Sequence, residues 1–256
     1  MRPLWTGNIS FGLINIPVSL YTASEDHALD FDMLRRGDLC KIRYMRICEV
    51  DGKEVPYENI VKGYKREDDS YVVLEKEDFK KASPKKSQVI EIEQFVHEDE
   101  IESKYFEKPY YLEPGKGADK AYVLLREALA QAKKVAVATY VFRTREDLVI
   151  LKPEGDVILL NQLRFKHEIR STKELKIPSV AEVTRAEIKT AVQLVDNLTG
   201  KFNIAKFKDT YTEDLKSIID KKGKGKAVKT KEYKSEPTKP TDLMEQLRAS
   251  LQQAHA

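Results

Sequence analysis

The chain has 256 residues, of which 41% are apolar and 34% are charged. This length is enough to bury a hydrophobic core without disulfide cross-links. The charged fraction is above the level typical of soluble domains, so the surface must be densely charged. No run approaches the roughly 18 apolar residues of a membrane span, and no apolar segment follows Met1. We therefore expect no membrane partner, no signal peptide and a cytoplasmic protein.

The two cysteines, Cys40 and Cys48, are separated by seven residues, and no second pair follows them. Structural zinc sites usually take their ligands from tighter pairs. The four histidines are scattered along the chain. The sequence therefore predicts two free thiols in a reducing compartment, with no metal and no cofactor.

The net charge of +3 is unevenly distributed along the chain. From Asp220 to the C-terminus, nine basic and five acidic residues give +4, which leaves −1 for residues 1–219. Any basic binding site in the body of the chain must therefore be local.

Residues 1–21 have the alternating pattern of β-structure. Apolar side chains occupy odd positions up to Leu13 and even positions from Ile14 onward. This change of phase beside Gly12 predicts a bulge or sharp bend, a feature that is common where a sheet curls into a barrel. Pro17 has no amide hydrogen, so it is expected at a sheet edge or a bulge.

Further β-like runs cover residues 71–74, 89–95, 110–112, 135–142, 148–151 and 157–160. One helix is embedded among them, from Asp119 as a plausible N-cap to Lys133 or Lys134. Asp51-Gly52 predicts a hairpin turn. Many strands with a single helix favour a mixed α/β fold centred on a β-barrel over alternating βαβ units.

Helical periodicity begins after Pro178, where Thr184 and Glu187 form a capping box and Gly200 ends the helix. A second helix is predicted over residues 212–222. The predicted apolar faces of the two helices are Ile188, Val192 and Val195, and Leu215, Ile218 and Ile219. The predicted organisation is a β-rich core over residues 1–178, a helical part over 179–220, a basic flexible linker over 221–240 and a short helix over 241–256.

Signatures of catalysis are missing from the sequence. Gly115-Lys116-Gly117 lacks the rest of a phosphate-binding loop, and no nucleophile-elbow motif occurs. The acidic run Glu98-Asp99-Glu100 keeps a metal-dependent nuclease open as an alternative, although such a run is usually a solvated face. We favour a protein that is not an enzyme.

Basic residues gather in short clusters. In Lys41-Ile42-Arg43-Tyr44, alternation would place Lys41 and Arg43 on one face of a strand, where they would meet a phosphate backbone. The candidate DNA-binding residues are Arg35, Arg36, Lys41, Arg43, Lys65, Arg66, Arg143 and Arg145, together with Lys221, Lys222, Lys224 and Lys226 of the linker. Each cluster alone also fits an ordinary exposed surface.

The last predicted helix carries a narrow apolar stripe formed by Leu243, Met244, Leu247 and Leu251. Asp242 and Glu245 give it a start like a capping box. A helix of about three turns is too short to be stable alone in water, so the stripe must be buried on something. Two alternatives stay open, namely the chain's own core and the groove of a partner protein. The flexible linker before the helix favours the second, in which these four residues dock a partner protein.

Several stretches resemble, in the same order, landmarks of the prokaryotic Ku proteins. They are Trp5–Val18, Ile60–Tyr64, Lys108–Pro114, Ala121–Leu129, Leu163–Phe165 with Glu168–Arg170, and Phe207–Tyr211. Collinear motifs over residues 1–222 are far more specific than any one of them.

The resemblance implies a β-barrel core with an arch-like insertion, closed into a ring by homodimerisation. Such a ring threads onto the ends of double-stranded DNA in non-homologous end joining, without reading sequence, and recruits an ATP-dependent repair ligase of the ligase D type. The resemblance implies no catalysis in that role and a nucleoid-associated location in the cytoplasm. Many relatives have a tighter cysteine arrangement near Cys48, and the C-terminal extension is short here. A nuclease acting on DNA ends remains the alternative.

Overall fold

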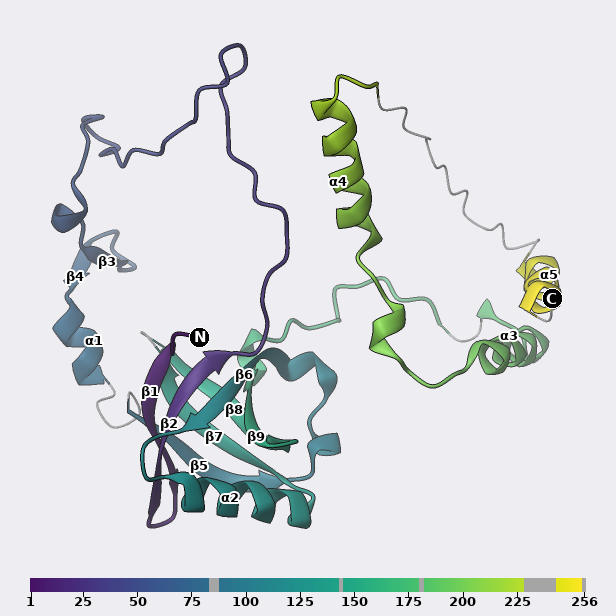
Figure 1. The fold of residues 1–256 in the computed structure, drawn as a ribbon, viewed down its shortest axis with the longest axis horizontal. Coiled ribbons are helices and arrows are strands. Elements are labelled where there is room, and N and C mark those ends of the chain that lie inside the picture. Colours follow the sequence, from purple (N-terminus) through teal and green to yellow (C-terminus); the bar gives the residue numbers. More distant parts are fainter. Residues whose placement is uncertain (83–87, 143–144, 180–181, 228–242, 255–256) are drawn as a thin grey trace. The chain divides into compact units, whose positions relative to one another are not determined.

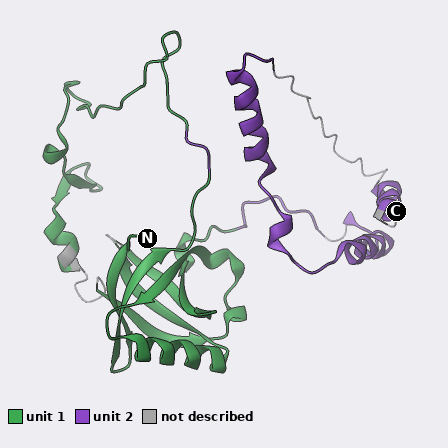
Figure 2. Cartoon of the chain, in the orientation of Figure 1, with its two compact units in different colours: residues 1–27, 31–171 green, residues 28–30, 172–256 purple. Residues whose placement is uncertain are grey.

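The computed structural model describes the chain except for residues 83–87, 143–144, 180–181, 228–242 and 255–256 (Figure 1). The chain divides into two compact units (Figure 2). The barrel unit comprises residues 1–27 and 31–171, and the C-terminal unit comprises residues 28–30 and 172–256. No helix within the described ranges is long and apolar enough to cross a membrane.

Seven strands of the barrel unit close into a barrel, which confirms the predicted barrel-centred mixed fold. They are β1 (Trp5–Phe11), β2 (Ile14–Thr22), β5 (Val89–Val96), β6 (Phe106–Pro114), β7 (Val135–Phe142), β8 (Arg145–Glu154) and β9 (Val157–Leu163). Their order around the barrel is β1-β2-β6-β9-β8-β7-β5. The closing pair, β1 with β5, is parallel, and the other pairs are antiparallel. Closure leaves no exposed strand edge on the barrel. Short 3-10 turns, η2 (Glu98–Glu100), η3 (Ser103–Tyr105) and η4 (Lys166–Glu168), flank its strands.

The change of phase near Gly12 is a tight hairpin between β1 and β2. Phe11 pairs with Ile14, and Gly12 adopts a φ of +59° that favours glycine. Because the chain reverses there, residues of the two phases face the same side of the sheet. Ile9 and Ile16 are directly opposed in the ladder, and both are buried.

The prediction that Pro17 lies at a sheet edge or a bulge is wrong, because Pro17 pairs with Asn8 within the closed barrel. On its other side, the β2–β6 ladder begins only at the next residue, where Val18 opposes Pro114. Pro17 therefore lies at the end of one ladder, where its missing donor is tolerated. The Gly115 amide donates to the Pro17 carbonyl at 2.8 Å, and a Cβ on Gly115 would stand 2.9 Å from Pro17 Cβ. Only glycine allows this close approach.

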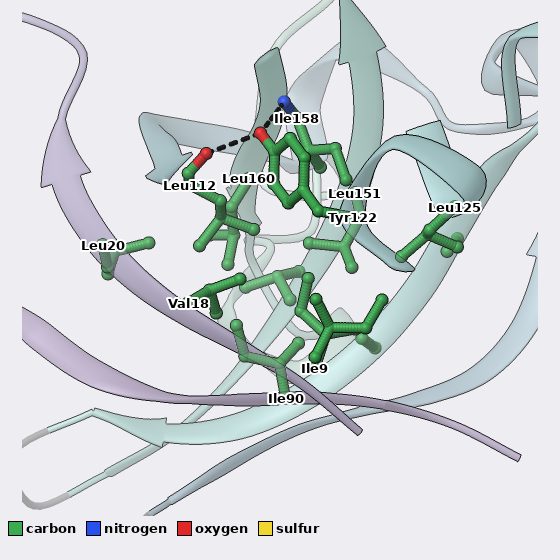
Figure 3. Packing of buried hydrophobic residues seen from close by; sticks show 14 of the residues in the cluster. Ile9, Val18, Leu20, Ile90, Leu112, Tyr122, Leu125, Leu151, Ile158 and Leu160 are labelled. Carbon is green, nitrogen blue, oxygen red and sulfur yellow. Dashed lines mark hydrogen bonds between the residues drawn. The ribbon is translucent and has the colours of Figure 1, made fainter. Parts of the chain in front are cut away.

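Helix α2 (Asp119–Ala132) packs against β8 and β2 (Figure 1). Its buried residues are Tyr122, Leu125 and Leu129. The N-cap is Ala118, so the prediction of Asp119 as the cap is wrong by one residue. Lys133 ends the helix with a left-handed φ of +52°. The side chains of α2 join the barrel interior in one hydrophobic core (Figure 3).

The Tyr122 hydroxyl bridges two strands of the barrel (Figure 3). It donates a hydrogen bond to the Leu112 carbonyl and accepts one from the Ile158 amide, each at 2.6 Å. Leu112 and Ile158 are opposed in the β6–β9 ladder. The hydroxyl therefore satisfies two buried backbone groups and fixes α2 to both strands.

We expect the Tyr122→Phe variant to lose about 1–3 kcal/mol of unfolding free energy, because two buried backbone groups lose their partner. Urea denaturation measures this loss. Tyr21→Phe is the matched control, since the Tyr21 hydroxyl donates to the Glu113 carboxylate on the exposed surface at 2.6 Å. Its loss of unfolding free energy should be clearly smaller, because water can replace the partner of an exposed group. Equal losses in the two variants would contradict the bridging role of Tyr122.

Residues 31–82, here called the insertion, contain little regular structure. They hold η1 (Tyr57–Asn59), the hairpin of β3 (Lys62–Lys65) and β4 (Tyr71–Leu74), and α1 (Lys76–Ala82). Isolated bridges join Leu34 to Lys41 and Ile47 to Glu54. The predicted turn at Asp51-Gly52 is confirmed inside the second bridge, with Gly52 at a φ of +68°. The predicted strand at residues 41–44 is wrong, because only Lys41 has a bridging partner and no ladder forms.

The C-terminal unit contains α3 (Arg185–Leu198), η6 (Ile204–Lys206), α4 (Thr210–Gly223) and α5 (Leu243–Ala254). The capping box of Thr184 and Glu187 is confirmed at the start of α3. Asp209 caps α4 by accepting from the Thr212 amide at 3.0 Å. Helix α5 contacts α3 (Figure 1), whereas the Asp242 cap proposed for α5 lies outside the described residues.

The predicted apolar faces of α3 and α4 are only partly covered within this chain. Ile188, Val192 and Val195 of α3 are all exposed, and Ile219 of α4 is exposed as well. Leu215 and Ile218 are half-buried. Among the described residues, no layer therefore covers the α3 face or the Ile219 side of the α4 face.

Candidate nucleic-acid interface

The predicted basic residues fall on three parts of the molecule. Arg35, Arg36, Lys41 and Arg43 lie in the irregular part of the insertion, Lys65 and Arg66 lie at the turn of the β3–β4 hairpin, and Arg145 begins β8. The six residues of the insertion are exposed. Arg143 lies outside the described residues. The insertion therefore presents a basic surface that is open to solvent.

Half of these insertion charges are compensated by a nearby carboxylate. Arg35 binds Asp38, Lys41 Nζ lies 2.7 Å from Asp32 Oδ2, and Lys65 Nζ lies 2.5 Å from Asp69 Oδ1. The guanidinium of Arg35 holds the pKa of the Asp38 carboxyl below its ordinary value. Arg36, Arg43 and Arg66 make no ion pair with any residue that the structure describes. These three side chains carry the uncompensated positive charge of the set.

Arg145 lies at one mouth of the barrel, among carboxylates. Its guanidinium Nε is 2.6 Å from Asp147 Oδ1, and other nitrogens of the group are 3.9 Å from Glu107 and 4.0 Å from Glu168. The Asp147 side chain is only 3% exposed, and burial raises the pKa of its carboxyl in spite of Arg145. Arg145 therefore compensates the negative charge of the buried Asp147 carboxylate at the mouth of the barrel.

The same mouth opens into a pocket of about 860 Å³. Its charged lining residues are Glu25, Asp26, Glu107, Asp147, Lys108 and Arg145. Carboxylates outnumber cations, so the pocket disfavours a phosphate. The Tyr140 hydroxyl is buried in the barrel without a hydrogen-bond partner among the described residues, and Tyr140 opposes Asp147 across β7 and β8.

The predicted linker lysines begin inside a helix. Lys221 and Lys222 belong to the last turn of α4, and the Lys226 amide donates to the Lys221 carbonyl at 2.9 Å. Lys221, Lys222, Lys224 and Lys226 are all exposed. Lysines at a helix C-terminus are favoured by the negative end of the helix dipole. Lys221 and Lys222 are therefore helical in the structure, and Lys224 and Lys226 directly follow the helix, where the sequence predicts a flexible linker.

The comparisons with known proteins decide the family. A Ku family model, described as the Ku70/Ku80 beta-barrel domain, matches residues 10–190. The chain belongs to the Ku family. Relatives named non-homologous end joining protein Ku include that of Opitutus terrae, 40% identical over 100% of this chain and 93% of the relative. Those of Coxiella burnetii and Pseudomonas aeruginosa are 38% and 36% identical over 98% and 95% of this chain, and over 94% and 85% of the relatives. Among solved structures, the SPOC domain of human PHD-finger protein 3 matches 63% of the chain and 95% of that domain at 11% identity, with a TM-score of 0.31 that is too low to support an argument.

The stretch Leu163-Arg164-Phe165 with Glu168, which resembles a landmark of the Ku proteins, lies at the mouth of the barrel. Arg164 lies 3.5 Å from Glu107, and the Phe165 amide donates to Glu168 at 2.7 Å. Sequence reasoning missed this network of Glu107, Asp147 and Glu168 around Arg145. The alternation of Arg145 with Asp147 on one strand was the only local signal, because Glu107 and Glu168 are distant in sequence.

Proposed function

We propose that this Ku-family chain binds the ends of double-stranded DNA as a homodimeric ring in non-homologous end joining, without base preference. In that role it is a scaffold with no catalysis of its own. It recruits an ATP-dependent repair ligase of the ligase D type, which docks on the apolar stripe of α5. The observation that carries the proposal is the match to relatives named for non-homologous end joining over nearly the whole chain. The uncompensated arginines of the insertion support contacts to phosphate rather than to base edges.

Exposed apolar side chains support the homodimer. The insertion exposes Phe31, Met33, Leu39, Ile42, Tyr44, Met45 and Ile47, and the C-terminal unit exposes Leu175, Ile177, Val195, Leu198, Phe202, Ile204 and Phe207. Monomeric soluble proteins rarely expose so many large apolar residues in two long segments. A second copy would cover them across a large two-fold interface.

We expect sedimentation equilibrium at micromolar protein to give about twice the chain mass of 29.4 kDa. The interface proposed here is large and apolar, so the dimer should persist in high salt, where ionic contacts are screened. A mass of one chain at that concentration would contradict the homodimer and, with it, the closed ring.

Comparison of linear with closed circular DNA of identical sequence tests the threading function. A ring can thread onto a duplex only at an end, so we expect stable complexes on the linear form and little on the relaxed circle. Circularising the linear DNA after binding should trap the protein against a salt challenge that strips it from open DNA. Equal affinity for both forms would overturn the ring. Strand loss in Mg²⁺ or Mn²⁺ would instead support the nuclease.

A further inference from the structure

The apolar stripe of α5 is already covered within this chain. Leu243, Met244, Leu247 and Leu251 are half-buried, whereas the other α5 residues whose burial is described are exposed. The only element of the described chain with extensive contacts to α5 is α3 (Figure 1). Both helices belong to the C-terminal unit. The surface assigned to the ligase is therefore occupied by the chain itself.

The face of α3 that receives α5 is defined by burial. Glu187, Thr190, Ala191 and Leu194 are half-buried, and every other residue of α3 is exposed. These four follow the i, i+3, i+4, i+7 spacing of one helix face. The face is neither the largest nor the most apolar that α3 offers, since the neighbouring stripe of Ile188, Val192 and Val195 stays exposed.

The composition of this face makes the contact weak enough to open. Leu194 is its only large apolar side chain, while Thr190 and Glu187 are polar and Ala191 is small. Helix α5 has 12 residues, which is too short to hold its helical form without a surface to pack on. The free energy needed to open a small contact of a short terminal helix is low compared with that of global unfolding. Its opening therefore requires little energy from a competing partner.

We propose that α3 masks the α5 stripe, so that the ligase must displace α3 to bind. This inference rests on the proposed role of α5 in ligase docking. Because the stripe is buried on α3 or on the ligase but not on both, the apparent affinity for the ligase is reduced by the fraction of chains in which α5 is free. Any event that weakens the α3–α5 contact then raises the affinity for the ligase without a change in the docking residues.

The test introduces a charge into the masking face of the full-length chain and measures binding to the cognate ATP-dependent repair ligase. Leu194→Asp should release α5 and strengthen ligase binding several-fold. Gln193→Asp is the matched control, because Gln193 is the adjacent residue on the exposed side of α3. It should leave the affinity unchanged. Ala191→Glu places a charge on the same face at a different residue and should also strengthen ligase binding.

Hydrogen exchange shows whether the variants act as intended. Amides of residues 243–254 should exchange faster in Leu194→Asp and Ala191→Glu than in the control, while amides of the barrel strands should not change. Faster exchange with unchanged ligase affinity would overturn the masking proposal. Weaker ligase binding would also overturn it, because α3 would then be part of the docking surface.

A change on α5 itself separates this proposal from the proposed function. Leu247→Asp should abolish ligase binding if the stripe is the docking surface. Ligase binding that survives Leu247→Asp would refute the docking role of α5. The exchange measurements on the α3 variants would still report whether α3 holds α5, so the two failures are distinguishable.

Discussion

The triple variant Arg36→Gln, Arg43→Gln and Arg66→Gln is expected to lose affinity for linear duplex DNA on the order of 100-fold at moderate salt. These arginines have no ion-pair partner in the described chain, so their charge is available to phosphates. A homodimer would lose six such charges. The slope of log affinity against log salt should decrease by about 0.9 for each phosphate that the variant no longer neutralises. Fluorescence anisotropy over a salt series measures both effects.

The matched control removes the same number of charges from the same segment. Arg35→Gln, Lys41→Gln and Lys65→Gln change residues that are paired with Asp38, Asp32 and Asp69. These pairs are exposed and contribute little to stability, so both triple variants should melt close to the wild type. We expect a clearly smaller loss of DNA affinity in the control. Equal losses of DNA affinity in the two triple variants would show that ion pairing with nearby carboxylates does not determine which cations contact DNA.

The barrel could be predicted from local patterns, but its closure could not. Alternation and turn residues mark most strands within a few residues of their true ends, because each strand faces a core on one side. The parallel pairing of β1 with β5 joins Asn8 to Val89, across the whole insertion. Nothing in the local sequence encodes that contact, since strand pairing depends on the tertiary arrangement.

In the candidate site too, contacts between residues close in sequence could be predicted, whereas contacts between distant elements could not. The basic residues were found from the sequence, and two of their partners stand three and four residues away, in Arg35–Asp38 and Lys65–Asp69. A search of the sequence for acidic residues three or four positions away would have found the carboxylates that pair with Arg35 and Lys65. The carboxylates around Arg145 could not all be found in that way, because they include Glu107 and Glu168 from other elements. The stripe on α5 was predicted, but α3 as its present partner was not.

The Arg145→Met variant is expected to destabilise the fold at neutral pH, because it leaves the buried Asp147 carboxylate without its cation. The Arg145 side chain is 55% exposed, so solvent screening keeps the loss well below the roughly 3–5 kcal/mol of a fully buried pair. Urea denaturation at pH 7 measures this loss. Adding Asp147→Asn to Arg145→Met removes the uncompensated charge and should recover a large part of the stability. Any loss of DNA binding in Arg145→Met must therefore be compared with its folded fraction before Arg145 is assigned to the DNA interface.

The pH dependence separates the two roles of Arg145. Burial raises the pKa of Asp147 above its ordinary value of 3.8, so the native state holds this proton to a higher pH than the unfolded state. This group's contribution to the unfolding free energy therefore falls as pH rises from 3.8 through the raised pKa, and it stays low above it. Loss of the Arg145 cation raises that pKa further and extends the fall to higher pH. The deficit of Arg145→Met should accordingly be small in acid and complete at neutral pH. A variant that is as stable as the wild type at every pH but binds DNA poorly would instead make Arg145 a phosphate contact.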